Sequence, residues 1–168
     1  MSLREKLVDY SCGNNLGLYW RLFYRRARTK SRWKALLLTF LLNRMAHRHG
    51  GYIGFGAEID GIPSLPHGLH GVYISRYAHI GAGCRIYQNV TVGEVNGKAP
   101  RVGKNCLIGA NACLVGDITV GDGARIGAGA AVAVDVPPGC TVTAQSPRIL
   151  ERGWDRDEKP SWARAGVD

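Results

Sequence analysis

The chain lacks most features that mark secreted, membrane-spanning or disulfide-stabilised proteins. Its N-terminus has no apolar segment followed by a small-residue cleavage site, so we expect no secretory signal. The longest apolar run, Ala35 to Leu42, is too short to span a bilayer. The 5 cysteines form no CxxC pair and are odd in number, which favours reduced packing residues over disulfides or metal ligands. At 168 residues, we expect one cytoplasmic domain with an appendage.

Acidic residues are scarce at the start of the chain. Residues 1–49 contain eleven Lys or Arg and only two Asp or Glu, whereas residues 50–168 contain eleven of each. The net charge of +9 therefore belongs to the first 49 residues. No nucleic-acid-binding motif accompanies this charge, so we expect no nucleic-acid partner.

The same basic segment has a helical pattern. Five apolar residues follow the i, i+3, i+4, i+7, i+8 spacing of an amphipathic helix: Trp33, Leu36, Leu37, Phe40 and Leu41. One interpretation is a helix that lies on anionic lipid at the inner face of the membrane. The other, which we favour and which is compatible with the first, is a helical cap on the end of the following domain.

After residue 50, glycine is too frequent for long helices, and an aliphatic residue recurs every sixth position. The repeated positions are Ile53, Ile59, Leu65, Ile74, Ile80, Ile86, Val92, Val102, Ile108, Leu114, Val120, Ile126 and Val132. Six steps of an α-helix would spread these side chains around its axis, whereas an extended chain points them all one way. A chain that runs straight, turns a corner and repeats explains the spacing, and a hexapeptide period is typical of a parallel β-helix.

Smaller residues support this interpretation. A small residue such as Ala78, Cys84 or Cys106 precedes many of the aliphatic positions by two, where it can fit inside a tight coil. Glycine or another turn-prone residue usually follows the aliphatic one, as expected at corners. The predicted fold is therefore mainly β, a parallel β-helix preceded by a short helical segment.

Two irregularities interrupt the repeat and indicate where chemistry could occur. The spacing from Leu65 to Ile74 is nine, and that from Val92 to Val102 is ten, so residues bulge out at both places. We expect the two bulges to flank one edge of the prism. The first bulge carries His67 and His70, and an exposed imidazole suits proton transfer near neutral pH. The histidines match no metal-ligand spacing, so no metal site is expected.

The stretches "LPHGLHGVYISRYAHIGAGCRIYQNVTVGE" and "PRVGKNCLIGANACLVGDITVGDGARIGAGAAVAVDVPPGCTVTAQSPRIL" resemble the serine acetyltransferase branch of the hexapeptide acyltransferases. The resemblance covers about residues 50–150. It implies a left-handed β-helix, a homotrimer and acetyl-CoA bound in the cleft between neighbouring subunits. The domains would be residues 1–49, a basic helical segment; 50–147, the β-helix; and 148–168, a tail.

The resemblance also implies residue roles. His67 falls on the catalytic histidine, which would act as general base toward an acceptor hydroxyl. Gly93, Ala110 and Ala128 fall where the family lines its acetyl-CoA channel with small residues and backbone amides. Arg148 lies where a basic side chain can meet the phosphates of the coenzyme.

This chain departs from the branch at substrate-binding positions. Pro66 and Ala99 stand where serine acetyltransferases carry an aspartate and a second histidine. Acidic residues elsewhere, together with His70, are therefore candidates to orient the base or hold the acceptor. The acidic candidates are Asp60, Glu58 and Glu94.

These departures, together with the basic N-terminal segment, favour an O-acetyltransferase that modifies a sugar or polysaccharide hydroxyl, as in capsule and exopolysaccharide synthesis. Serine O-acetylation is the alternative. A third hypothesis is a noncatalytic scaffold or a zinc-dependent hexapeptide protein of the carbonic anhydrase type. The expected partners are two further copies of the chain, acetyl-CoA and a glycan acceptor, at the cytoplasmic face of the membrane.

Overall fold

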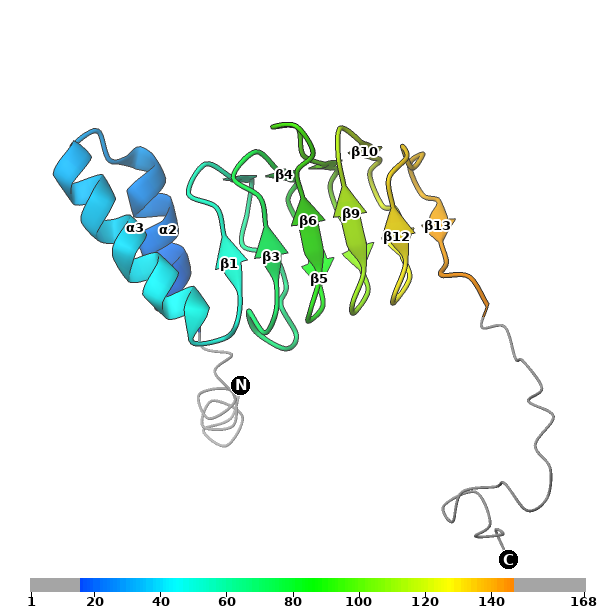
Figure 1. Cartoon of the computed structure of the whole chain (residues 1–168), viewed down its shortest axis with the longest axis horizontal. Helices are drawn as coiled ribbons and strands as arrows, with labels where there is room; N and C mark the ends of the chain where they lie inside the picture. The colour runs from blue at the N-terminus through cyan, green and yellow to red at the C-terminus, as the bar shows by residue number, and fades with distance from the viewer. Residues whose placement is uncertain (1–15, 147–168) are drawn as a thin grey trace, which may run out of the picture.

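The computed structural model describes residues 16–146. Within this range, helices α2 (Gly17–Arg28) and α3 (Arg32–His47) lead into a column of thirteen short strands (Figure 1). The strands are β1 (Tyr52–Ile53), β2 (Glu58–Ile59), β3 (Tyr73–Ile74), β4 (His79–Ile80), β5 (Arg85–Ile86), β6 (Thr91–Gly93), β7 (Arg101–Val102), β8 (Leu107–Ile108), β9 (Cys113–Val115), β10 (Thr119–Val120), β11 (Arg125–Ile126), β12 (Ala131–Val132) and β13 (Thr141–Val142).

Three parallel sheets form the walls of a prism. The first sheet has the order β1-β3-β6-β9-β12, the second β10-β7-β4-β2 and the third β13-β11-β8-β5. From β3 to β12, consecutive strands fall in the first, second and third sheets in turn, so three strands complete one coil. The predicted parallel β-helix is confirmed, and it is consistent with the left-handed coil that the family resemblance implies.

The column's interior consists of the predicted aliphatic residues. Nearly every two-residue strand has an exposed or half-buried first residue and a buried second one, and this second residue occupies the repeated position. Ile74, Ile108 and Ile126 have no exposed surface, whereas Leu65, beside the first bulge, is only partly buried. Burial of each such side chain stabilises the fold by about 1.5–3 kcal/mol. The period of six thus delivers one large side chain from each wall to a shared core.

The corners of the prism depend on residues that accept a positive φ. Gly71, Asn89 and Asn111 occupy one corner in three successive coils, with φ values of 64°, 56° and 59°. The Asn89 side chain donates from Nδ2 to Asn111 Oδ1 at 3.2 Å. A Cβ atom on Gly71 would stand 2.0 Å from Asn89 Oδ1, so the corner needs glycine in the earlier coil and accepts asparagine in the next.

The two helices cover the first coil (Figure 1). Tyr19, Trp20 and Phe23 of α2, with Leu42 and Ala46 of α3, are buried in the same cluster as the first strands. The predicted capping role of the helical segment is therefore what the structure shows.

The predicted apolar stripe of α3 faces away from the core, contrary to the expectation that it packs on the domain. Trp33 is 84 % exposed, Phe40 is 62 % exposed, and Leu36, Leu37 and Leu41 are exposed as well. The helix packs instead through its opposite side, where Leu42 and Ala46 are buried and the Arg26 side chain bonds to Thr39 at 3.1 Å. Because α3 is apolar on both sides, its sequence spacing identifies the helix but not the side that packs.

Candidate functional site

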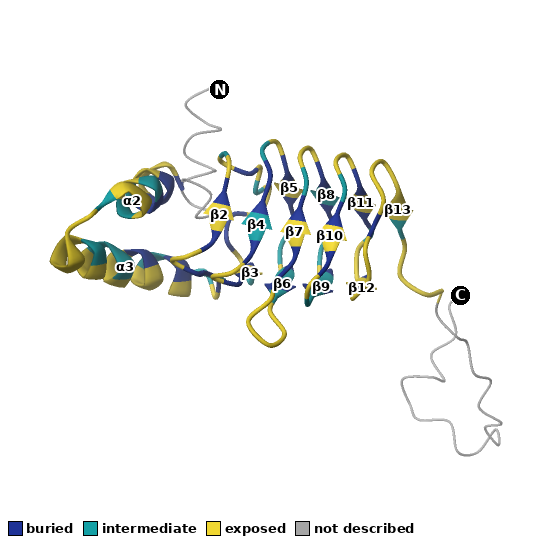
Figure 2. Ribbon diagram, turned by 90° about the horizontal axis from the view of Figure 1, so that it is seen from above, coloured by how far each residue is buried: buried dark blue, intermediate teal, exposed yellow. Residues whose placement is uncertain are grey.

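The two interruptions of the repeat lie at different corners of the prism. The first occupies residues 66–71, between Ser64, which bridges to β5 of the third sheet, and β3 of the first sheet. The second occupies residues 94–100, between β6 of the first sheet and β7 of the second. The first sheet therefore separates them, and the expectation that both flank one edge is wrong. Figure 2 shows the second interruption as an exposed loop projecting beside β6.

The first loop holds His67 in solvent on a firmly anchored turn. Gly68 N donates to Leu65 O at 3.0 Å, and Leu69 is completely buried beneath the loop. Gly71 N donates to His49 O at 3.1 Å, which ties the loop to the segment that follows α3. The exposed His67 imidazole therefore stands on a fixed backbone, as a general base requires.

Tyr87 in the next coil is the aromatic neighbour of His67. The two ring centroids lie 6.0 Å apart at an interplanar angle of 46°. Within residues 16–146, no hydrogen bond or ion pair joins the His67 side chain to another side chain. The sequence reasoning missed Tyr87 and Gln88, although both lie in the quoted "YQNVTVG" region. The Gln88 Oε1 atom is buried without a hydrogen-bond partner among the described residues.

Corner hydrogen bonds connect the His67 loop to the same corner of the following coils. Asn89 N donates to His70 O at 2.9 Å, and Asn111 N donates to Gln88 O at 3.1 Å. Gly129 N then donates to Ala110 O at 2.8 Å. We call this corner between the third and first sheets the histidine edge; it consists of residues 67–71, 87–89, 109–111 and 127–129.

The histidine edge brings together three of the predicted site residues. His67, Ala110 and Ala128 all lie along it, with Ala110 half-buried and Ala128 exposed. Three coil steps separate His67 from Ala128, or about 14 Å at the usual spacing of parallel strands. The edge can therefore support an extended ligand that begins near an imidazole and passes small side chains.

Gly93 and Glu94 lie on the other side of the first sheet. The Ser75 hydroxyl donates to Glu94 Oε2 at 2.6 Å, and Ser75 itself is buried. Both residues line a cavity of about 350 Å³ with Tyr52, Tyr73 and Gly93. In a single chain, this cavity and His67 lie near opposite ends of the strands of the first sheet, because the His67 loop precedes β3 and Glu94 follows β6.

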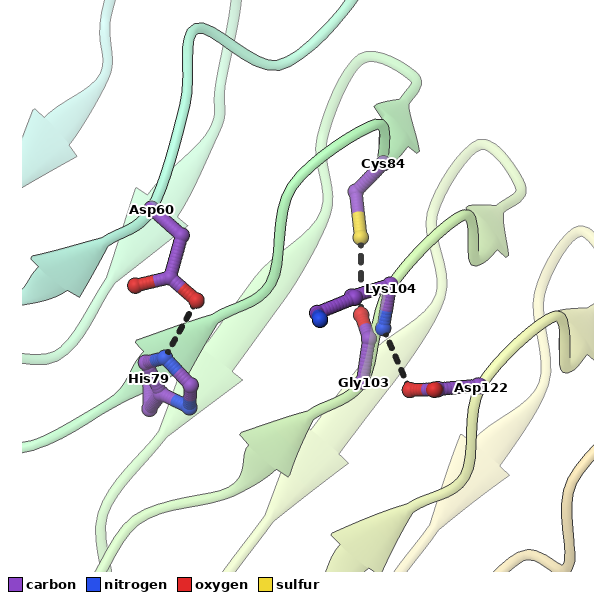
Figure 3. A network of polar contacts seen from close by, with 6 residues as sticks. All are labelled: Asp60, His79, Cys84, Gly103, Lys104 and Asp122. Carbon is purple, nitrogen blue, oxygen red and sulfur yellow. Dashed lines mark hydrogen bonds and ion pairs between the residues drawn. The ribbon is translucent and has the colours of Figure 1, made fainter.

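Glu58 lies in β2 of the second sheet and Asp60 directly follows that strand, and the second sheet does not border the histidine edge. Asp60 Oδ2 lies 3.0 Å from His79 Nε2, the contact drawn in Figure 3. Glu58 is exposed on β2, in register with His79 of β4. Within one chain, Asp60 thus contacts His79 rather than the proposed base.

The two departures from the family pattern have different surroundings. Pro66 is exposed immediately before His67. Ala99 is buried beneath the second loop, and its own side chain is a single methyl group. The neighbouring Lys98 points outward, and its ammonium group forms an ion pair with Asp117 at 2.5 Å.

His70 lies beside His49, with 5.1 Å between ring centroids. Partial burial, together with the nearby His70 and Arg48, lowers the pKa of His49. Among residues 16–146, no group of three or more His, Cys, Asp or Glu side chains could hold a metal ion. Arg148, predicted to meet coenzyme phosphates, lies outside the described residues.

Two cysteines in the coils, Cys84 and Cys106, are packing residues. Cys84 donates its thiol to Gly103 O at 3.1 Å (Figure 3), and burial raises the pKa of Cys84 to about 11. Cys106 is equally buried. The four cysteines in the described part of the chain are free thiols.

Comparisons with known proteins agree with this geometry. Residues 99–133 match the family described as bacterial transferase hexapeptide (six repeats). The serine acetyltransferase of Helicobacter pylori (strain J99) is 36 % identical over 139 residues, covering 80 % of this chain and 74 % of the relative. That of Synechococcus elongatus is 39 % identical, covering 68 % of this chain and 46 % of the relative. The chain thus spans less than half of some of its curated relatives.

Solved structures give the same result. The serine acetyltransferase of Neisseria gonorrhoeae in complex with serine aligns with a TM-score of 0.68 at 32 % identity, covering 76 % of this chain and 53 % of that one. Isoform 3 from Entamoeba histolytica in complex with cysteine aligns with a TM-score of 0.62 at 30 % identity, covering 69 % and 43 %. The expectation of a sugar or polysaccharide acceptor is therefore wrong, because the relatives that match are serine acetyltransferases. The resemblance to capsular enzymes is likewise not supported.

Proposed function

Because the chain belongs to the hexapeptide-repeat transferases, as a homologue of serine acetyltransferases, we propose that it moves the acetyl group of acetyl-CoA to the hydroxyl of L-serine. The family uses acetyl-CoA as its co-substrate. The observation that carries the proposal is the exposed His67 imidazole, fixed at the start of an edge that offers small residues to an extended ligand.

His67 would act as a general base in a direct transfer. The serine oxygen attacks the thioester carbonyl carbon while its proton passes to an imidazole nitrogen of His67. When the tetrahedral intermediate collapses, the carbon–sulfur bond breaks and the imidazolium returns its proton to the departing thiolate. No acyl-enzyme forms, so the mechanism assigns no role to the cysteines.

The histidine edge supports the binding of acetyl-CoA. Ala110 and Ala128 leave room for an extended pantetheine chain. Within residues 16–146, their backbone amides are not among those that bond between coils, so they are our candidates to stabilise the oxyanion. Gly93, on the other side of the first sheet, is our further candidate for lining the channel; separately, a Cβ atom there would lie 3.2 Å from Val115 Cγ1 of the same chain. Arg148 is our candidate for the coenzyme phosphates.

A trimer would complete this site. Hexapeptide-repeat transferases are typically trimers. In one chain, His67 and the cavity beside Glu94 flank opposite ends of the first sheet, so a site that uses both needs two subunits. In that arrangement Glu94, held by Ser75, offers a carboxylate to the serine ammonium or to His67. His70 is the second candidate for orienting the base.

A thiol-release assay tests the proposal. The purified protein should release free CoA from acetyl-CoA when L-serine is added, with O-acetylserine as product. His67→Ala should lower kcat at least about 100-fold, which is the usual scale of a general base. His79→Ala, on the second sheet, is the matched control and should retain activity. Absence of turnover with L-serine, or full activity of the His67 variant, would refute the assignment.

A further inference from the structure

We propose that the outer face of α3 docks on an anionic membrane surface, an interaction that does not depend on the proposed acetyl transfer. This apolar face consists of Trp33, Leu36, Leu37, Phe40 and Leu41, with exposed fractions of 84, 62, 60, 62 and 40 %. All five lie within three turns of one helix. A continuous exposed patch of this kind marks an interaction surface.

The apolar face is not needed to hold the helix on the domain. Leu42 and Ala46 are buried on the opposite side of α3, which packs on α2 and the first coil. Figure 2 shows this division, with exposed colouring along the outer side of α3 and buried residues toward the column. The apolar residues therefore have a role other than capping.

Charge determines the kind of partner. Residues 16–49 contain nine Lys or Arg and no Asp or Glu. Arg32 and Lys34 stand at the start of α3, and Arg44 lies beyond Phe40 on the same side of the helix, one turn further on. Tryptophan, leucine and phenylalanine bordered by basic side chains form the pattern by which a helix lies in the headgroup region of anionic lipid.

No helix among residues 16–146 is long and apolar enough to cross a membrane. The helices stand at the end of the column where the first coil begins, so a bilayer that touched α3 would meet this end of the molecule (Figure 1).

Two other occupants match the apolar and basic side chains of this face less well. A symmetric contact between α3 and the α3 of a second copy would bring two faces of the same positive sign together, because the helix pair has no acidic residue to match its basic ones. Residues 1–15 carry two basic and two acidic side chains and so offer no net charge to complement the basic residues. An anionic lipid surface complements both the apolar side chains and the charge.

Vesicle flotation with the full chain tests this inference. The protein should float with vesicles of 70 % phosphatidylcholine and 30 % phosphatidylserine, should not float with pure phosphatidylcholine, and should be released at high salt. Leu37→Glu and Phe40→Glu should each lower the bound fraction at least about tenfold. Val134→Glu changes a 70 % exposed apolar residue on the column and should bind as the unaltered chain does.

Three outcomes would overturn the inference: no flotation with the anionic vesicles, unchanged flotation of both α3 variants, or flotation that appears only after residues 1–15 are deleted. Light scattering of the same samples distinguishes vesicle binding from self-association of the protein. A concentration-dependent assembly that Leu37→Glu abolishes, without lipid binding, would assign the face to a second copy. Thiol release with L-serine, measured in parallel, keeps this result separate from the proposed function.

Discussion

Gly71 provides the sharpest test of how the histidine edge is held together. Its φ is 64°, and an alanine Cβ there would stand 2.0 Å from Asn89 Oδ1. Gly71→Ala would therefore force the Asn89 side chain to move and break its 3.2 Å bond to Asn111. The same substitution disturbs the turn that carries His67, because Gly71 N donates to His49 O.

The size of the effect follows from two contributions. Alanine at a left-handed φ costs about 1–2 kcal/mol, reduced by about 0.4–1 kcal/mol of lost freedom in the unfolded chain. The lost side-chain hydrogen bond adds about 0.5–1.5 kcal/mol. Gly71→Ala should therefore cost about 2 kcal/mol in total.

Gly129→Ala is the matched control. Gly129 occupies the same corner in a later coil with a φ of 69°, but a Cβ there has nothing within 4 Å. This variant should suffer only the backbone cost, so its Tm should exceed that of Gly71→Ala by about 2–4 °C for each kcal/mol of difference. Thermal unfolding by circular dichroism at one protein concentration and one heating rate measures both.

A second substitution checks the cause. Asn89→Gly keeps the positive φ without strain and removes Oδ1, so the double variant Gly71→Ala/Asn89→Gly should lose less than the sum of the two single variants. Equal Tm values for Gly71→Ala and Gly129→Ala, or strict additivity in the double variant, would refute the steric account.

Three further predictions concern the core, the helix junction and the thiols. Ile108→Ala should lower the unfolding free energy by about 2–5 kcal/mol in urea, and the half-buried Leu107→Ala by clearly less; equal losses would contradict the inward orientation of Ile108. The lowered pKa of His49 means that the folded state disfavours its proton, so stability falls as the pH drops below about 6.5. His49→Gln should therefore flatten the decline in urea-unfolding free energy between pH 7.5 and 5, and an unchanged slope would count against this origin. Because burial raises the pKa of Cys84 to about 11, iodoacetamide at pH 8 should label the exposed Cys140 in the native protein and leave Cys84 unmodified. Mass spectrometry of the labelled native protein measures both sites, and a labelled Cys84 would contradict this prediction.

The sequence predicts the column well because each coil repeats the same local problem. A buried aliphatic residue, a small residue two positions earlier and a turn-prone corner recur, and these constraints act within a few residues. Ile74, Ile108 and Val120 are buried as their spacing predicts. The location of His67 in an exposed loop also follows from the break in the period.

Properties that depend on contacts between residues far apart in the chain could not be predicted from the sequence. The stripe of α3 identifies a helix, but only the packing of α2 beneath it decides that Phe40 remains exposed. The pairing of Glu94 with Ser75 depends on the register of β3 against β6. The corner that each bulge occupies depends on the number of strands that precede it around the prism. An error of one strand in that count places a loop at a different corner.

The acceptor was inferred wrongly for a related reason. Pro66 and Ala99 are single positions at which the chain differs from the pattern, and we weighted these losses above the similarity of the whole solenoid. Ala99 is buried, so its side chain reports on packing under the loop as much as on substrate choice. Similarity across most of the chain to serine acetyltransferases outweighs both substitutions.

Because the corners stack coil on coil, the length of the column can change only in steps of one coil. Paired residues such as Tyr73 and Thr91 stand 18 positions apart in a regular coil, so inserting or deleting one such block preserves every inward side chain. Each block changes the length of the histidine edge by about 4.8 Å and by no smaller amount. Insertions and deletions can therefore change the distance between the imidazole and the far end of the ligand site only by whole coils. Smaller changes must come from substitutions of side chains at the corners.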